Sequence, residues 1–428
     1  MEPMLSVAIL NDLHRHRDAG GHVKTWERFA EAATALDDQL ELTLYFQGEQ
    51  DGETRVAQNV RYVTLRPVLS TERIAFLTRL SEHTDLARLN RRLFRALRVH
   101  DVFHTTHAAF TQARTALAFA RRHGTALVDS VHTDVPRFAR IYGEQVLERM
   151  FGTTGLAARA LRRIDIPGRR AHALRRRIER HWRACAHVLV SQTRDFEHAA
   201  SIVGAERVSY LGRGIDRAVF APERADRRRL ARRFGVPPDT VALLFVGRVD
   251  PSKSVLTFAH AVRALRERGH PVHALLVGRG NQAREVSDLL GEGVSMTGPL
   301  PQSELGWIYA SCDLLVFPSR TETFGNVVLE AQACGLPAVV ADEGGAPERV
   351  RDGVDGIVVR DPDPGAWTEA LDALLRDDGR RARLRRGALE GSGRPTWRDV
   401  LETDLLPVWR DAVRRSARVR GPSELQSR

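Results

Sequence analysis

The chain has 428 residues, of which 43% are apolar, and a formal net charge of +11. This length exceeds one typical hydrophobic core and predicts two domains, each able to bury its own core. No apolar run reaches the ~18 residues of a membrane-spanning helix and no signal-peptide pattern precedes the first predicted strand, so we expect a cytoplasmic protein.

Cysteine and lysine are both rare in this sequence. The three cysteines, Cys185, Cys312 and Cys334, are scattered through apolar surroundings, which argues against disulfides and zinc and predicts buried thiols. The positive charge is almost wholly arginine, since lysine occurs only at Lys24 and Lys253. Because the two cations are not equivalent at a tight anion site, the choice of lysine favours a functional role for Lys253 and, more weakly, for Lys24.

The first half of the chain alternates between strand and helix patterns. A polar loop is expected over residues 11–21, closing in the pair Gly20 and Gly21. Strands that alternate with helices predict a parallel sheet covered on both faces. The predicted strands are 6–10, 40–46, 102–104, 126–131 and 187–191, and the predicted helices are 23–36 and 111–122.

After a predicted hinge at residues 207–216, the same alternation starts again. The expected strands are 241–246, 272–277, 314–317 and 338–341, and the expected helices are 253–268, 303–310 and 327–334. The predicted fold class is therefore α/β, with two doubly wound Rossmann-like domains facing across a cleft. We place them at 1–208 and 209–395, with a helix at about 396–418 that braces back to the first domain.

An arginine-rich stretch at residues 144–183 is predicted to be helical, with an interruption at residues 165–168. A basic amphipathic helix can lie on an anionic membrane surface, so peripheral contact with the inner face of the cell membrane is one interpretation. A solvated helical face in an arginine-rich protein is the other, and the sequence leaves both open.

The segment from Phe317 to Gly345 carries the strongest functional pattern. It predicts a buried strand, a polar turn that contains Glu322, and an apolar helix that contains Glu330. Burying a carboxylate among apolar residues is costly unless it accepts hydrogen bonds, and the hydroxyls of a sugar or ribose can donate them. The start of the helix, near Asn326, is suited to a phosphate.

A second candidate site follows the predicted strand at 241–246. Arg248 and Lys253 place a cation at each end of a short loop, at the carboxyl end of a strand where α/β sheets bind ligands. These cations could neutralise a departing diphosphate, whose charge grows in the transition state.

Together these segments resemble the retaining, nucleotide-sugar-dependent glycosyltransferases of the GT-B fold, in the large family that contains the bacterial α-mannosyl- and glucosyltransferases. The resemblance covers roughly residues 5 to 410. Its signature is a glutamate pair separated by seven residues, which Glu322 and Glu330 match. Further matches are Gly20-Gly21, residues 132–136, residues 213–216, Gly247-Arg248 with Lys253, and Gly344-Gly345.

The resemblance implies a role for each matching residue. Glu330 would hold the ribose hydroxyls and Glu322 the donor sugar, while Arg248 and Lys253 would grip the diphosphate. His132 would face the sugar as the catalytic-site histidine. The remaining donor-binding residues would be Gly20, Gly21, Thr297 in the segment beside the base, Thr323, Phe324, Gly325, Asn326 and Val327.

Two features limit what the resemblance implies. Relatives often carry an acidic residue in the turn where this chain has Gly278-Arg279-Gly280, which weakens the prediction of base recognition there. The histidine pairs His14 with His16 and His104 with His107 lack the other ligands of a metal site, so we expect neither metal nor cofactor.

The predicted activity is transfer of a hexose from a UDP- or GDP-sugar to a hydroxyl of a lipid, glycan or small-molecule acceptor. Domain closure would exclude water, and the departing phosphate would take the acceptor proton. The alternatives are a phosphorylase or synthase that uses a sugar phosphate, and a non-enzymatic basic protein that binds nucleic acid or membrane. Against nucleic acid, the arginines are spread along the chain without an aromatic stacking pattern.

Overall fold

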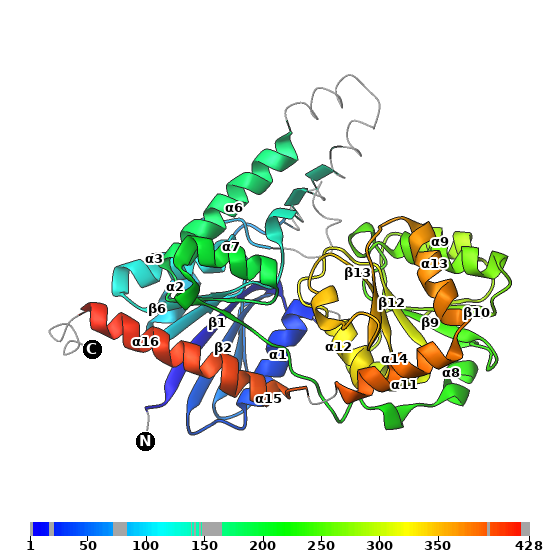
Figure 1. Cartoon of the computed structure of the whole chain (residues 1–428). Helices are drawn as coiled ribbons and strands as arrows, with labels where there is room; N and C mark the ends of the chain where they lie inside the picture. The colour runs from blue at the N-terminus through cyan, green and yellow to red at the C-terminus, as the bar shows by residue number, and fades with distance from the viewer. Residues whose placement is uncertain are drawn as a thin grey trace. The chain divides into compact units, whose positions relative to one another are not determined.

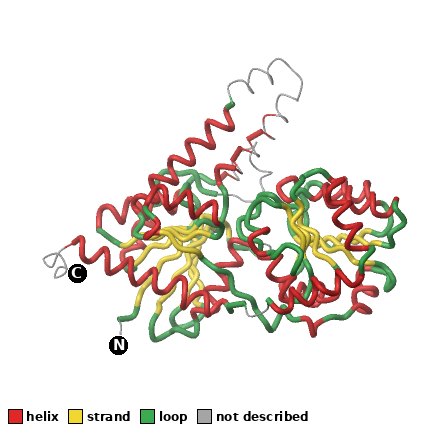
Figure 2. Tube along the Cα trace, viewed as in Figure 1, coloured by secondary structure: helices red, strands yellow, loops and turns green. Residues whose placement is uncertain are grey.

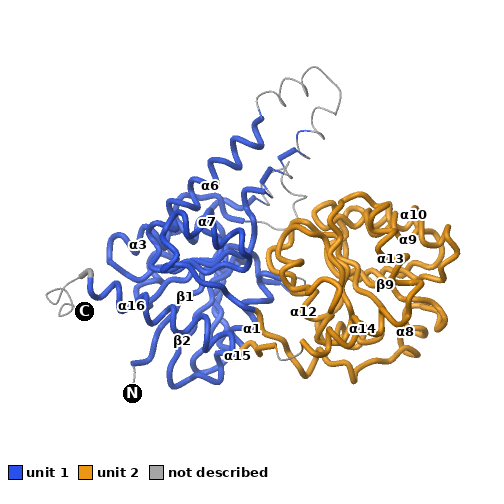
Figure 3. Tube along the Cα trace, viewed as in Figure 1, with its two compact units in different colours: residues 1–212, 398–428 blue, residues 213–397 orange. Residues whose placement is uncertain are grey.

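The fold is taken from a computed structural model, which describes residues 3–16, 21–71, 84–137, 139–140, 143–144, 147, 165–391 and 394–420. The chain divides into two compact units (Figure 3). Unit 1 comprises Met1–Gly212 and Arg398–Arg428, and unit 2 comprises Arg213–Trp397. The chain therefore passes from one unit to the other twice.

Unit 1 is built on an eight-stranded sheet in the order β3-β4-β2-β1-β5-β6-β7-β8. Figure 1 labels β1, β2 and β6 among these strands. Every neighbouring pair is parallel except the edge hairpin of β3 and β4. Since β1 lies between β2 and β5, the strand order reverses beside β1. The strands are β1 Leu5–His14, β2 Leu40–Gln47, β3 Gly52–Arg55, β4 Val60–Leu65, β5 Val102–Thr105, β6 Ala126–Ser130, β7 His187–Val190 and β8 Val208–Tyr210.

Helices pack on this sheet from several parts of the sequence. Helix α3 contacts β1, β5 and β6, and α16, from the end of the chain, contacts β5 and β6. The helices are α1 Gly21–Ala33, α2 Arg91–Ala96, α3 Thr111–His123, α6 Ile166–Ala184, α7 Thr193–Val203 and α16 Leu406–Arg420, with short turns at η2 Leu97–Val99, η3 Ala205–Arg207 and the π-helical η7 Leu401–Leu405. Helix α15, Trp397–Val400, carries the chain back into unit 1.

Unit 2 contains a six-stranded, wholly parallel sheet in the order β11-β10-β9-β12-β13-β14. In each unit the strands run between helices (Figure 2). The first strand of this sheet, β9, lies beside β12, so the order reverses between them. The strands are β9 Val241–Val246, β10 Val272–Val277, β11 Val294–Met296, β12 Leu314–Phe317, β13 Ala338–Ala341 and β14 Gly356–Val359.

The helices of unit 2 form two groups. Helix α9 packs against α10 and α13, and α12 packs against α11 and α14. The helices are α8 Arg227–Phe234, α9 Val255–Glu267, α10 Ala283–Leu290, α11 Gln302–Ser311, α12 Asn326–Ala333, α13 Pro364–Leu375 and α14 Asp378–Glu390, with 3-10 turns at η4 Pro222–Arg224, η5 Pro251–Lys253 and η6 Pro347–Arg349.

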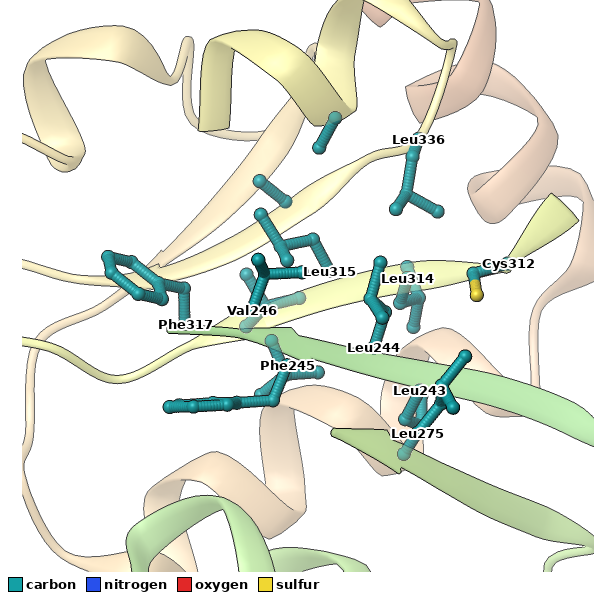
Figure 4. Close-up of a cluster of buried hydrophobic side chains, with 14 of the residues drawn as sticks. Leu243, Leu244, Phe245, Val246, Leu275, Cys312, Leu314, Leu315, Phe317 and Leu336 are labelled. Atoms are coloured by element: carbon teal, nitrogen blue, oxygen red, sulfur yellow. The ribbon is translucent and has the colours of Figure 1, made fainter. Parts of the chain in front are cut away.

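The central strands of unit 2 are buried on both faces, as expected for a parallel sheet covered by helices. Leu243, Leu244 and Phe245 of β9 and Leu314 and Leu315 of β12 are all 0% exposed and lie together in the core (Figure 4). These rigid strands fix the starting points of the loops that follow them.

The fold confirms the predicted class, two doubly wound Rossmann-like sheets, and places a strand or helix at each predicted position in the described chain. One local prediction was wrong. Residues 11–14 continue β1 rather than starting a loop, because Asn11 and Asp12 are buried in the sheet. The predicted hinge at 207–216 contains the boundary between the two units, after Gly212, and its first part is the edge strand β8, which pairs with β7.

All three cysteines are free and buried, as predicted. Of the helices in the described residues, none combines the length and apolar character that a bilayer crossing requires.

Candidate functional site

The ends of β9 and β12 form the topological switch point of unit 2, where open α/β sheets bind ligands. The loop after β9 carries Arg248 and Lys253, and the loop after β12 carries Glu322. These residues come from distant parts of the sequence, but the strand order brings their loops together.

The loop after β9 is held by its own aspartate. Asp250 accepts hydrogen bonds from the backbone N–H of Ser252 at 3.0 Å and from its hydroxyl at 2.5 Å. Arg248 contacts this aspartate, with its Nε 3.3 Å from Asp250 Oδ2, and donates a hydrogen bond to Ser252 Oγ at 3.0 Å. The Arg248 guanidinium is thus fixed on the loop, and it remains 30% exposed for an anionic ligand.

Lys253 and Glu322 form an ion pair, with 2.6 Å between Lys253 Nζ and Glu322 Oε2. Both side chains are mostly buried, at 14% and 20% exposure. Burial alone would raise the pKa of the Glu322 carboxyl, but Lys253 and the backbone N–H groups of Gly325 and Phe324 hold that pKa below its usual value. The ion pair therefore favours the ionised form of the buried Glu322 carboxyl.

Glu330 lies on α12 and is 9% exposed. Its carboxylate accepts hydrogen bonds from the Tyr309 hydroxyl at 3.0 Å and from Gln302 Nε2 at 3.2 Å. Both donors come from α11, which packs beside α12. These two partners were missed in the sequence analysis, and they account for the stable burial of the carboxylate.

The backbone around Thr323 is enclosed by glycines. A Cβ on Gly344 would lie 2.5 Å from the carbonyl oxygen of Glu322, and one on Gly345 would lie 2.2 Å from that of Thr323. Gly325, at φ 92°, occupies the N-cap of α12 in the left-handed region that favours glycine. The motif glycines therefore let the turn fold tightly beside the helix N-terminus.

Three further residues expected to bind the donor lie in the same unit. Phe324 is buried under the guanidinium groups of Arg213 and Arg349, at 4.7 and 4.3 Å from its ring centroid. Asn326 and Val327 open α12, and both are half-buried. Asn326 Oδ1 is a buried atom with no hydrogen-bond partner among the described residues.

Thr297 follows β11, the edge strand of the unit 2 sheet beside β10. Its N–H donates to the carbonyl of Leu276 at 3.0 Å, and Gly298 forms an isolated antiparallel β-bridge with Gly278. Cβ atoms on Gly278 and Gly280 would lie 1.8 and 2.1 Å from backbone oxygens of the loop after β9. Gly278 and Gly280 therefore allow the loop after β10 to pack closely on the loop after β9.

His132 lies just after β6 in unit 1 and is half-buried. Its Nε2 is 2.7 Å from Ser130 Oγ. Its ring stacks on His22 at 4.4 Å between centroids, and His22 stacks in turn on His107 at 4.2 Å. The structure therefore places His132 in a cluster of aromatic rings that the sequence analysis did not foresee.

Gly21 and Lys24 lie in the first turn of α1. Gly20 is outside the described residues, and Gly21 is the exposed first residue of the helix. Lys24 forms an ion pair with Glu27 one turn later, at 2.7 Å, and Glu27 also pairs with Arg15. An ion pair on the helix surface is sufficient to explain a lysine at position 24 without a role in ligand binding.

Two of the four histidines considered for a metal site have other contacts. His104 Nδ1 accepts from Trp409 Nε1 and its Nε2 lies 2.8 Å from Ser130 Oγ, while His107 stacks on His22. Across the described ranges, no group of three His, Cys, Asp or Glu side chains is arranged to hold a metal ion.

Comparisons with known proteins agree with this geometry. A family model described as "Glycosyl transferases group 1" matches residues 240–377. A D-inositol 3-phosphate glycosyltransferase of Thermobifida fusca is 30% identical over 430 residues, covering 92% of this chain and 89% of that protein. A protein of the same name from Stackebrandtia nassauensis is 38% identical over 226 residues, so the match spans about half of its length.

A similar solved structure is Anabaena Alr3699/HepE in complex with UDP and glucose. It has a TM-score of 0.64 at 17% identity, and the match covers 93% of this chain and 97% of that one. This likeness supports the fold, two Rossmann-like units of the GT-B type.

Proposed function

This chain belongs to the group 1 glycosyltransferases, and on that premise we propose that it is a retaining transferase that moves a hexose from a nucleotide diphosphate sugar to a hydroxyl of an acceptor. The observation that carries the proposal is the Lys253–Glu322 ion pair at 2.6 Å, at the switch point of unit 2. It supports the proposal because a cation that could bind the donor's phosphates lies beside a carboxylate that could accept hydrogen bonds from the donor sugar.

The charges at this site match the demands of the reaction. Loss of a nucleoside diphosphate builds negative charge on the departing oxygen, and fixed cations in a water-poor site stabilise that charge. Lys253 and Arg248 supply the cations, and the N-terminus of α12 adds backbone N–H groups. We infer that Glu330, eight residues after Glu322, binds the ribose hydroxyls.

The proposed chemistry needs no separate base. The bond from the anomeric carbon to the phosphate oxygen breaks, and the acceptor oxygen bonds to that carbon on the same face. The departing phosphate takes the acceptor proton, so a nucleoside diphosphate and a glycoside are formed. Arginine, lysine and helix N–H groups take the place of a metal ion in this scheme.

The relatives suggest which substrates to try first. Their printed name, D-inositol 3-phosphate glycosyltransferase, makes D-inositol 3-phosphate the first acceptor for testing. UDP-glucose, UDP-N-acetylglucosamine, GDP-mannose and ADP-glucose are suitable donors, because they vary the base and the sugar separately.

The test is a calorimetric screen of these donors, followed by an assay of nucleotide release with the acceptor present. We expect one donor to bind and to release nucleoside diphosphate only when acceptor is added. Release that depends on inorganic phosphate would favour the alternative of a phosphorylase. Absence of binding by every nucleotide would overturn the proposal.

We also propose peripheral contact with an anionic membrane, on the observation of α6. Within the described part of the chain, its exposed arginines have no carboxylate within ion-pair distance; these are Arg169, Arg170, Arg175, Arg176, Arg180 and Arg183. The rest of the predicted basic stretch lies mostly outside the described residues.

Sedimentation with vesicles that contain phosphatidylglycerol tests this membrane contact, and we expect the vesicles to remove the protein from solution. Replacing Arg169, Arg176 and Arg183 with glutamine should lower the bound fraction at least several-fold. Undiminished binding would contradict the proposal.

A further inference from the structure

A chain of hydrogen bonds in unit 1 joins the C-terminal helix α16 to His132. Trp409 Nε1 donates to His104 Nδ1 at 2.9 Å. His104 Nε2 lies 2.8 Å from Ser130 Oγ, and the same oxygen lies 2.7 Å from His132 Nε2. Trp409 and His104 are both 0% exposed. Four side chains from three elements and one loop are therefore connected in a line.

Trp409, at one end of the line, determines which group donates in each of its hydrogen bonds. An indole N–H can only donate, so His104 Nδ1 must accept. Burial lowers the pKa of His104 to about 3, so its ring is neutral and carries its one proton on Nε2. That proton is donated to Ser130 Oγ.

Ser130 accepts from His104 and donates to His132. Its hydroxyl has one hydrogen, and His104 already donates to its oxygen. Ser130 contacts no acceptor besides the two histidines among the described residues, so its hydrogen points to His132 Nε2. We infer that Trp409, through His104 and Ser130, holds His132 as the neutral tautomer protonated on Nδ1, which makes Trp409 a positioning residue.

The opposite arrangement leaves buried hydrogens without acceptors. A proton on His132 Nε2 would point at Ser130 Oγ, where His104 Nε2–H already points, and the serine hydrogen would lose its acceptor. A proton on His104 Nδ1 would face the Trp409 N–H directly. Buried polar groups are rarely left in either state.

The position of the ring is fixed as well as its proton. His22 stacks on the His132 ring at 4.4 Å, and Trp26 lies at a tilt with 5.6 Å between centroids. Trp26 also meets His104 edge-on at 4.8 Å. The rings around the hydrogen-bonded line thus hold both histidines in place.

The chemical consequence is that the ring of His132 carries a hydrogen-bond donor at Nδ1, while its Nε2 is occupied by the Ser130 hydroxyl. The use of this donor rests on the proposed function and on the role that the family resemblance implies for His132, which is to face the transferred sugar. The structure then assigns His132 to the recognition of a sugar hydroxyl by donation. Such a role agrees with a reaction in which the departing phosphate takes the proton.

The tautomers can be measured by nitrogen-15 NMR on the full chain labelled at histidine, because the two ring nitrogens differ in shift when protonated. Resonances of His132 are assigned by their loss in His132→Gln. In the wild type we expect His132 to be protonated on Nδ1 and His104 on Nε2. A wild-type His132 protonated on Nε2 would overturn the inference.

Two variants test the direction of the line. Trp409→Phe removes the indole donor and should turn both His104 and His132 into mixtures of tautomers. Ser130→Ala should release His132 alone, because Trp409 still fixes His104. An unchanged His132 in both variants would show that the line does not control it.

A matched control is Trp182→Phe. Trp182 is also buried in unit 1, and its indole donates to Asp129 Oδ2 at 2.8 Å. This variant loses an equivalent bond outside the line, so both histidines should keep their tautomers. Mixed tautomers in this control would mean that general loosening of unit 1, and not the line, explains the effect.

Turnover separates this inference from the proposed function. With a donor that binds, Trp409→Phe should lower kcat on the order of 10-fold and leave the donor KM unchanged, while Trp182→Phe retains kcat. If kcat of Trp409→Phe stays at the wild-type value although the tautomer of His132 changes, the role in sugar recognition is overturned. If the wild type transfers no sugar at all, the proposed function fails, and the NMR result still decides the tautomer.

Discussion

The two units handle buried polar groups in opposite ways. In unit 2, the buried carboxylate of Glu322 has a lysine 2.6 Å away, and its pKa is held below the usual value. In unit 1, burial raises the pKa of the Asp12 and Asp129 carboxyls to about 7. It also lowers the pKa of His104 to about 3.

The difference shows which kind of interaction each unit offers to a ligand. Unit 2 keeps full charges in a water-poor place, which suits the phosphates of a nucleotide. Unit 1 uses neutral imidazoles, a hydroxyl and stacked rings around His132, which suits uncharged hydroxyl groups. From this contrast in charge we propose that unit 2 binds the donor and that unit 1 binds the acceptor.

Lys253→Ala is the strongest test of the contrast, because it removes the cation from unit 2. We expect kcat to fall on the order of 10²- to 10³-fold, since one fixed charge on the leaving group is lost. The Glu322 carboxyl would also lose the cation that opposes its burial, so its pKa should rise. Steady-state kinetics of nucleotide release would measure the first effect.

Lys24→Ala is the matched control for that variant. Lys24 is the other lysine of the chain, and it also forms an ion pair at 2.7 Å, with Glu27 on the surface of α1. Its kcat should stay within about twofold of the wild type, because exposed ion pairs contribute little. Equal losses in the two variants would remove the argument that Lys253 has a special role.

The second prediction concerns Asp12 and Asp129, the two buried carboxyls of unit 1 whose pKa is raised to about 7. The pKa of Asp12 is 3.8 when unfolded and about 7 when folded, so the folded state binds the extra proton between these values. Stability should therefore fall as the pH rises from about 4 to about 7. Asp12→Asn cannot ionise, and its Oδ1 can still accept from the Gln112 N–H that Asp12 binds at 3.1 Å.

Hydrogen exchange of the β1 and β2 amides at pH 5 and pH 8 would measure this effect in unit 1 alone. The wild type should lose on the order of 2 kcal/mol of opening free energy between these pH values, and Asp12→Asn should lose less. Asp129→Asn is the parallel variant, since Asp129 has the same raised pKa. Identical pH slopes in wild type and both variants would contradict the assignment.

The sequence was sufficient to predict the central strands of unit 2. Lys253, Glu322 and Glu330 lie in two strand–loop–helix segments, and their local spacing was the basis for predicting phosphate and hydroxyl binding, which stays a prediction. The ion pair between Lys253 and Glu322 was not predicted, because each was assigned to a part of the donor and the two are 69 residues apart. The edge strands β3, β8 and β11 lack a buried apolar run, since β3 is exposed throughout and β8 and β11 have three residues each.

The polar network of unit 1 could not be predicted from one sequence. Trp409 and His104 are 305 residues apart, and nothing in either segment indicates the other. The C-terminal helix was expected, but Trp409, which is 0% exposed, was not singled out in it. Such contacts depend on how α16 lies on β5 and β6, and therefore on the whole fold of unit 1.

The smallest expected effect comes from Tyr309→Phe, which tests whether unit 2 also positions its second glutamate. The hydroxyl of Tyr309 is buried and donates to Glu330 Oε2 at 3.0 Å, so its removal leaves that oxygen with one donor fewer. If Glu330 binds the ribose, nucleoside diphosphate should bind about 10-fold more weakly, because the carboxylate is less well oriented. Calorimetry with Glu330→Ala as the reference for full loss would measure this, and Tyr309→Phe should lie between that variant and the wild type. Unchanged affinity in Tyr309→Phe together with a large loss in Glu330→Ala would mean that Gln302, 3.2 Å from Oε1, is sufficient to orient the carboxylate.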